Sequence, residues 1–159
     1  MEKKTYIGVD LGGTKLLVGE MDREGNILRT KRYPSGRLTK PEAMALIQKA
    51  LDEFLAEKTP GCEPCAIGIG MVGRIDNRTG TWYEISPDRK DTVEVGSILS
   101  ARYGIPCFVD NDVRSVFRGL GYQVPAYEEI ELEQERYIKR SGRNPKKIRE
   151  KLEKQKKGA

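Results

Sequence analysis

Residues 6–19 read YIGVDLGGTKLLVG, and this stretch decides the fold. An apolar, β-branched run ends at Asp10, the chain breaks at two glycines, and a second apolar run follows. Two apolar runs separated by a short glycine break predict a β-hairpin. Because the break carries no bulky side chains, its backbone N–H groups can face an anion, with Thr14 and Lys15 beside them.

Asp10 stands where the first predicted strand gives way to the turn. A carboxylate there would face the same anion, an arrangement that is favourable only with a cation such as Mg²⁺ between them. The stretch therefore suits a metal–polyphosphate complex, in which Asp10 would hold the metal, directly or through water, and phosphate would be bound by Gly12, Gly13, Thr14 and Lys15. The alternative is an ordinary tight hairpin with an exposed acid.

The same stretch resembles a known family. It is similar to the first phosphate-binding hairpin of the superfamily of actin, heat-shock ATPases and sugar kinases, and VDLGGTK at residues 9–15 resembles the opening of ROK proteins (repressors, open reading frames and sugar kinases). The resemblance extends over residues 4–119. It implies ATP and Mg²⁺ as cofactors and a sugar as the substrate.

A second informative site reads VDND at residues 109–112, after a predicted buried strand. Strands of α/β sheets deliver polar groups to their carboxyl ends, where ligands bind. Asp112 would start a helix, whose dipole favours the ionised carboxylate that can take a proton from a hydroxyl during phosphoryl transfer. Asn111 can both donate to and accept from a sugar hydroxyl. The alternative is that Asp112 is only a helix cap.

The strand, Asn, Asp and helix that follow Gly-Ile-Pro resemble the corresponding segment of ROK sugar kinases. In that family the Asp is the catalytic base and the Asn contacts the sugar, so the resemblance implies these roles for Asp112 and Asn111. ISPD at residues 85–88 resembles the sugar loop of the family, with Asp88 in place of the usual Asn. This replacement leaves the identity of the sugar open.

GIGMVG at residues 68–73 matches the dinucleotide fingerprint GxGxxG, but turn-forming residues rather than a helix follow it. We therefore expect the glycines to let a loop approach a ligand or an opposite backbone closely. The segment resembles the ROK stretch that precedes a substrate loop, although Val72 stands where the family usually has proline. Gly73 is included among the predicted sugar-binding residues.

Composition narrows the choice further. A chain of 159 residues with 37% apolar content can bury one core and carry an appendage. It has no histidine, so we expect Asp or Glu as the general base near neutral pH. Cys62 and Cys65 form a CxxC with only Cys107 besides them, which we interpret as structural, reduced thiols. With no long apolar run and no signal-like N-terminus, we expect a cytoplasmic protein that does not bind membranes.

The order of elements predicts an α/β fold of the ribonuclease H-like, actin-like type with a mixed sheet. Three strands come first, and Thr39 and Glu42 form a capping box for a helix that follows, in which apolar residues recur at helical spacing. A strand at residues 65–70 comes next, and then a helix that Asp91 or Thr92 caps and Gly104 ends. The predicted order ends with a strand at residues 106–109 and a helix from residue 112.

Residues 122–159 differ in character from the rest. Eleven Lys or Arg and two Asp or Glu fall within residues 136–159, so the remainder of the chain has more acids than bases. The tail has few apolar residues to pack, and we expect it to be solvated and helical or disordered. The predicted division is an N-terminal lobe at residues 1–121 and a charged tail, without a domain of its own, at residues 122–159.

These observations predict the N-terminal lobe of an ATP-dependent hexose kinase of the ROK type. We expect a truncated lobe with little activity alone, because phosphoryl transfer depends on positioning between two clamps. Sugar and ATP are the expected partners, in a homo-oligomer or with a complementing C-terminal lobe. One alternative is a non-catalytic sugar-binding regulator of the family, although no DNA-binding helix pair precedes the first strand. The other is a nucleic-acid-associated protein acting through its basic tail, which the scarcity of aromatic residues there disfavours.

Overall fold

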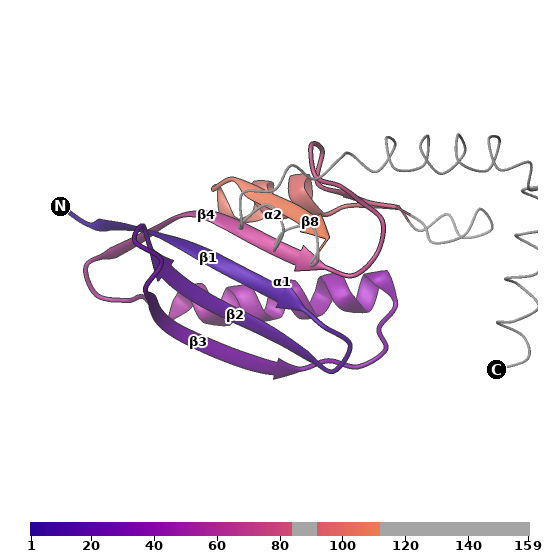
Figure 1. Cartoon of the computed structure of the whole chain (residues 1–159), viewed down its shortest axis with the longest axis horizontal. Coiled ribbons are helices and arrows are strands. Elements are labelled where there is room, and N and C mark those ends of the chain that lie inside the picture. Colours follow the sequence, from indigo (N-terminus) through magenta and orange to yellow (C-terminus); the bar gives the residue numbers. More distant parts are fainter. Residues whose placement is uncertain (84–91, 112–159) are drawn as a thin grey trace, which may run out of the picture. The chain divides into compact units, whose positions relative to one another are not determined.

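The computed structural model describes residues 1–83 and 92–111 (Figure 1). The elements in these residues, in chain order, are β1 Lys3–Leu11, β2 Lys15–Asp22, β3 Ile27–Pro34, α1 Lys40–Ala56, β4 Cys62–Met71, β5 Ile75–Asp76, β6 Thr81–Trp82, β7 Val93–Glu94, α2 Val95–Tyr103 and β8 Cys107–Asn111. The helix predicted from residue 112, the boundary predicted at residues 121–122 and the charged tail lie outside the described residues.

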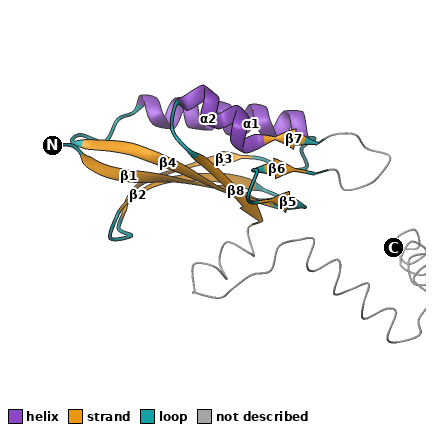
Figure 2. Ribbon diagram, turned by 90° about the horizontal axis from the view of Figure 1, so that it is seen from above, coloured by secondary structure: helices purple, strands orange, loops and turns teal. Residues whose placement is uncertain are grey.

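The main sheet has five strands in the order β3-β2-β1-β4-β8. β1, β2 and β3 form an antiparallel meander, whereas β4 and β8 run parallel to β1. This mixed sheet confirms the predicted fold class. Both helices cover the same face of the sheet in Figure 2. A smaller antiparallel sheet, in the order β5-β6-β7, lies between β4 and α2 along the chain.

Alternation along the strands places the core between this face and the helices. On β1, Ile7 and Val9 are buried, whereas Gly8 and Asp10 belong to the opposite face. The same period continues on the neighbouring strands. The buried apolar side chains of the strands and helices include Leu16, Val18, Ile47, Leu51, Phe54, Ile67, Ile69, Met71, Val95, Leu99 and Val109.

The start of α1 follows the sequence prediction. Thr39 is the N-cap, its hydroxyl accepts from the Glu42 backbone N–H, and the Glu42 carboxylate accepts from the Thr39 backbone N–H at 2.7 Å. This reciprocal capping box satisfies two helix-terminal donors, and the apolar stripe of α1 is buried as predicted. The end of α2 is also as predicted, because Gly104 adopts the left-handed conformation that stops the helix.

Three boundaries differ from the prediction. β8 covers Cys107–Asn111 rather than the predicted residues 106–109. β4 begins at Cys62, three residues before the predicted start, so the CxxC lies in the strand and not in a loop. Extra pairing of β1 with residues 62–64 explains the longer strand. Thr92 does not cap α2, because β7 at Val93–Glu94 intervenes and Glu94 takes the cap position without a side-chain cap. Asp91 lies outside the described residues.

A buried polar network joins β1, β2 and β3 to the end of α1. The Glu20 carboxylate is 1% exposed and accepts hydrogen bonds from Thr5 at 2.6 Å, Thr59 at 2.5 Å and Arg29 at 2.7 Å. Arg29 also stacks over the ring of Phe54 at 3.7 Å. Burial would raise the pKa of Glu20, but these hydrogen bonds outweigh it and lower the pKa. The network is a paired buried charge and so a structural feature.

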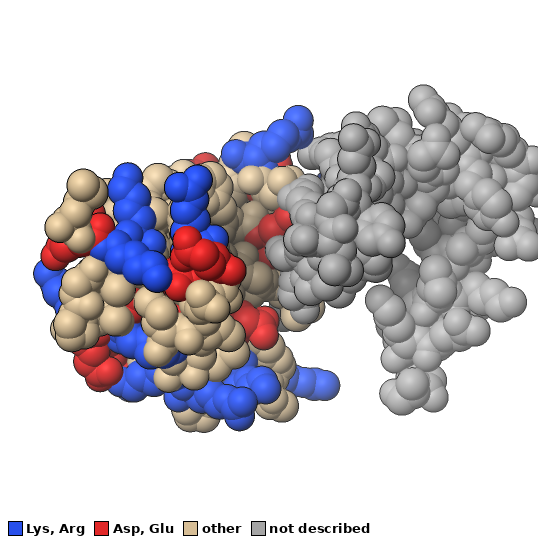
Figure 3. All heavy atoms as spheres, turned by 60° about the vertical axis from the view of Figure 1, so that its left-hand side comes forward, with Lys and Arg blue, Asp and Glu red and all other residues tan. Residues whose placement is uncertain are grey.

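The surface carries charges of both signs. Figure 3 shows Lys and Arg side chains standing beside Asp and Glu side chains on the face that it draws. Lys31, for example, forms ion pairs with Glu57 at 3.0 Å and Glu53 at 3.7 Å. Interspersed charges of this kind contribute little to stability one by one.

Candidate active site

The structure confirms the β-hairpin predicted from residues 6–19, as the antiparallel pair β1–β2. The Gly12 backbone N–H donates to the Lys15 carbonyl at 2.9 Å and closes the turn. Ser35, just after β3, holds the turn from the side: its backbone N–H donates to the Thr14 carbonyl at 3.1 Å and its hydroxyl to the Gly12 carbonyl at 3.0 Å. The turn is therefore fixed at both ends.

One detail of the predicted phosphate site changes. The Gly12 N–H is used within the turn, so it is not a donor facing an anion, because an internal hydrogen bond closes the short hairpin. Gly13, Thr14 and Lys15 are exposed at the tip. Asp10 is exposed as well, one residue before the turn. Any phosphate contact here would use the tip residues.

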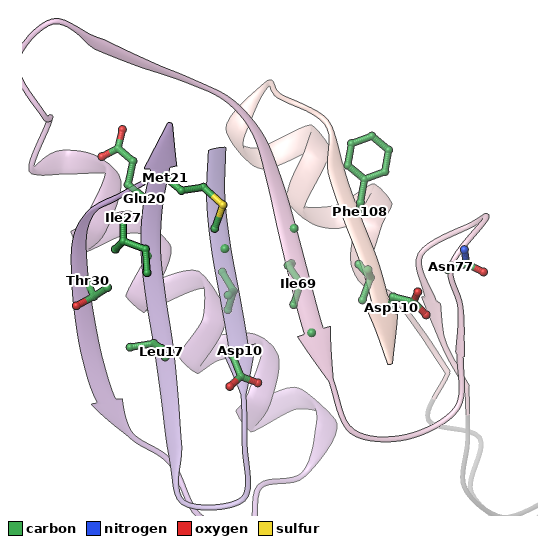
Figure 4. A pocket seen from close by; sticks show the side chains of 16 residues that line it. Asp10, Leu17, Glu20, Met21, Ile27, Thr30, Ile69, Asn77, Phe108 and Asp110 are labelled. Atoms are coloured by element: carbon green, nitrogen blue, oxygen red, sulfur yellow. The ribbon is translucent and has the colours of Figure 1, made fainter. Parts of the chain in front are cut away.

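Three parallel strands, β1, β4 and β8, end at one edge of the sheet next to this turn. The register pairs Asp10 with Gly70 and Gly70 with Asp110, so these residues share the face turned away from the helices. Figure 4 shows the two carboxylates toward the carboxyl ends of their strands. Asn111 is in the next row, paired with Met71 on the helix-covered side.

Asp110 is thus the acid that the described residues place with Asp10, and sequence reasoning did not single it out. Its carboxylate accepts from the Asn111 backbone N–H at 2.8 Å. The signal was present in the sequence, because alternate residues of a strand share a face and the strand ends in Asp-Asn.

A groove of about 810 Å³ lies on the face of the sheet turned away from α1 and α2, beside Asp10 and Asp110 (Figure 4). Its floor is a row of three glycines on adjacent strands, Gly19 on β2, Gly8 on β1 and Gly68 on β4. Phe108 on β8 continues this row, and its side chain is 63% exposed. The groove is therefore mostly apolar, with acids at one end.

Asn111 and Gly73, both predicted to bind sugar, are in contact. The Asn111 side-chain Nδ2 donates to the Gly73 carbonyl at 3.1 Å. Gly73 has a φ of 122°, which favours glycine, and a Cβ at this position would lie 2.9 Å from Nε1 of Trp82. Gly73 therefore has a structural requirement in addition to any contact with a ligand. β5 and not a helix follows it, so the dinucleotide fingerprint lacks its helix.

The remaining predicted site residues, Asp88 and Asp112, lie outside the described residues. Among residues 1–83 and 92–111, no group of three or more Cys, Asp or Glu could hold a metal ion. Asp10 alone still suits Mg²⁺, which commonly binds one or two carboxylates together with waters and substrate phosphates. Within the same ranges, neither helix has the length and apolar character needed to cross a membrane.

The mixed sheet, the hairpin turn and the polar carboxyl edge define a ribonuclease H-like domain of the actin-like class. A family model described as ROK family matches residues 6–123. The chain belongs to the ROK family, as the sequence motifs predicted.

Curated relatives include sugar kinases. The glucokinase of Streptomyces coelicolor is 36% identical over 116 residues, which cover 71% of this chain and 34% of that protein. The N-acetyl-D-glucosamine kinase of Escherichia coli is 30% identical over 109 residues, covering 67% of this chain and 34% of the relative. The chain therefore spans about a third of the length of the curated relatives it matches.

Solved structures share the fold. A ROK family glucokinase from Streptomyces griseus, in complex with glucose and AMPPNP, has a TM-score of 0.54 and 31% identity and covers 68% of this chain and 33% of that chain. A ROK family transcriptional regulator, a homolog of the E. coli MLC protein, has a TM-score of 0.56 over 69% of this chain and 28% of its own. At 17% identity the regulator shows likeness of fold alone.

Proposed function

We propose that this chain is the sugar-binding and metal-side lobe of an ATP-dependent hexose kinase. The observation that carries the proposal is the shared edge of the sheet, where Asp10 lies one residue before the end of β1 and Asn111 ends β8 beside the hairpin turn. Relatives named as glucokinase and N-acetyl-D-glucosamine kinase support it and suggest a hexose as the substrate.

In this proposal the sugar hydroxyl oxygen attacks the γ-phosphorus of ATP, and the bond from that phosphorus to the bridging oxygen of ADP breaks. Asp112 accepts the hydroxyl proton as general base. Asn111 and Gly73, with Asp88, bind the sugar, and the Gly73 carbonyl holds the Asn111 amide in one orientation. Phosphoryl transfer depends mainly on such positioning, because the protein itself forms no bond to phosphorus.

At the other end of the reacting groups, Gly13, Thr14 and Lys15 contact phosphate at the tip of the turn. Asp10 holds Mg²⁺, which neutralises phosphate charge when it is bound. Ser35 keeps the turn in place through its two hydrogen bonds. These residues span about a third of the length of the relatives, so we expect a second lobe to provide the other nucleotide contacts and the 159 residues alone to have little activity.

Titration calorimetry with glucose, mannose and N-acetylglucosamine tests sugar binding by the full 159-residue chain. We expect binding of one of these sugars, weakened at least about tenfold by Asn111→Ala, the size of one lost hydrogen-bonding group. Absence of binding to all three would refute the sugar site. A coupled assay with Mg·ATP measures transfer, and robust turnover that depends on Asp112 would refute the expectation of low activity while supporting the reaction.

The second candidate is a non-catalytic sugar-binding regulator, since the fold also occurs in a transcriptional regulator. The test mixes this chain with a full-length ROK kinase whose own catalytic base has been removed, so that the added kinase supplies the second lobe. Sugar binding without phosphoryl transfer in this mixture would favour the regulator. The basic segment at residues 136–159 lies outside the described residues, and its nucleic-acid alternative stays a prediction. Salt-dependent retention on heparin that disappears on deleting this segment would support that alternative.

A further inference from the structure

Lys40 is a cation in an unfavourable place. It is the first residue of α1, and it is only 5% exposed. The N-terminus of a helix carries the positive end of the helix dipole, so a cation there is disfavoured. Burial of an amine adds a further cost unless the amine is hydrogen-bonded. Helix capping does not require this lysine, because Thr39 and Glu42 provide the cap.

The contacts of Lys40 converge on the end of β6. Its Nζ donates to the carbonyl of Tyr83 at 2.5 Å and makes a longer contact with the carbonyl of Trp82 at 3.5 Å. The same Nζ lies 5.1 Å from the centroid of the Trp82 ring, within range of a cation–π interaction. One buried amine therefore holds both the backbone and the side chain where β6 ends.

A hydrogen bond and side-chain packing connect the end of β6 to the loop that carries Gly73. The Tyr83 backbone N–H donates to the Arg74 carbonyl at 2.9 Å. The Trp82 indole fills the space that a Cβ on Gly73 would occupy, 2.9 Å from Nε1. Among the described residues, this Nε1 is the one buried side-chain polar atom without a hydrogen-bond partner. Packing against Gly73, and not a hydrogen bond of its own, thus fixes the indole.

The last contact reaches the proposed sugar site. The Gly73 carbonyl accepts from Nδ2 of Asn111 at 3.1 Å, so the position of this carbonyl fixes the orientation of the Asn111 amide. We propose that Lys40 is a positioning residue for sugar binding. It acts through Trp82 and Gly73 on Asn111, and it does not itself touch the sugar. This inference rests on the proposed function, since the effect is read at the sugar site.

The test compares Lys40→Met, which keeps the aliphatic stem and removes the amine, with Lys49→Met, a matched change at an exposed lysine of the same helix. Lys40→Gln is the milder second variant, with a shorter neutral donor. Sugar affinity is measured by calorimetry well below each unfolding midpoint, so that loss of folded protein does not enter. Acrylamide quenching of Trp82, the only tryptophan in the chain, reports its burial without any sugar.

We expect Lys40→Met to weaken sugar binding by about tenfold and to raise the quenching of Trp82, while Lys49→Met changes affinity by less than about twofold. We expect the loss of sugar affinity in Lys40→Gln to fall between the losses in the other two variants. Unchanged sugar affinity in either folded Lys40 variant would overturn the inference and leave the proposed function standing. Failure of both variants to fold would also overturn it, by assigning Lys40 a purely stabilising role. Absence of sugar binding in the unsubstituted chain would refute both proposals.

Discussion

Replacement of Gly73 by alanine should destabilise the fold more than the same replacement at Gly61 or Gly13. Its φ of 122° lies where residues with a side chain are strained, at a cost of about 1–3 kcal/mol. The added Cβ would also lie 2.9 Å from Nε1 of Trp82, so the indole or the loop must shift, at a further cost of about 1–3 kcal/mol. Together these effects come to about 2–6 kcal/mol, a large part of the stability of a small domain.

Two other glycines separate the contributions. Gly61 has a φ of 70° and no described atom within 4 Å of its Cβ position, so alanine there tests backbone strain alone, at about 1–2 kcal/mol. Gly13 has neither a positive φ nor a described neighbour within 4 Å, and alanine should change stability by less than about 1 kcal/mol.

Urea unfolding followed by the fluorescence of Trp82 measures all three variants, because the chain has no other tryptophan. We expect the loss of stability to decrease in the order Gly73, Gly61, Gly13. Equal unfolding free energies for the Gly73 and Gly61 variants would show that contact with Trp82 adds nothing. That result would also remove one link from the series of contacts that joins Lys40 to Asn111.

Thr39→Ala should cost about 1 kcal/mol, because it removes the side-chain half of the capping box, and a thermal midpoint unchanged from the parent would contradict this. Glu20→Ala should cost about 3 kcal/mol by leaving Arg29 without its buried partner, as measured by urea unfolding; a loss below 1 kcal/mol would count against it. Since the folded pKa of Glu20 is lowered, its ionisation stabilises the fold above its ordinary pKa of 4.5, and this stability is lost as the pH falls below that value toward the folded pKa. Glu20→Gln should lose less stability at acid pH than the parent. An identical pH profile would refute the assignment of this pH dependence to Glu20. Burial and the hydrogen bond to Asp52 raise the pKa of Tyr103 to about 12. Ultraviolet titration should therefore show Tyr103 ionising at lower pH in the Asp52→Asn variant, and an unchanged pKa would contradict the pairing.

Local sequence signals predicted the parts of the fold that depend on neighbouring residues. The glycine break and its flanking apolar runs identified the β1–β2 hairpin, because a turn needs only a few residues to specify it. Thr39 and Glu42 identified the start of α1 through a capping box that spans one helical turn. Gly104 identified the end of α2. Together with the order of the elements, these signals were enough for the fold class.

The missed features depend on contacts between distant segments. The face that Asp110 shares with Asp10 follows from the register of β1, β4 and β8, which no short motif encodes. The N–H of Gly12 is used inside the turn, a detail of backbone geometry that the residue type does not reveal. Sequence patterns did not single out Lys40, which is buried where the end of β6 contacts the start of α1.

The row formed by Gly19, Gly8 and Gly68 has a consequence for how this sequence can diverge. The three positions lie side by side on adjacent strands, and a large side chain at any one of them would enter the space above the others. The methyl group of Met21 already comes within 3.7 Å of where a Cβ on Gly8 would be. A bulky replacement at one position therefore restricts what its neighbours can accept. Substitutions at these three positions therefore depend on one another, although the positions are far apart along the chain.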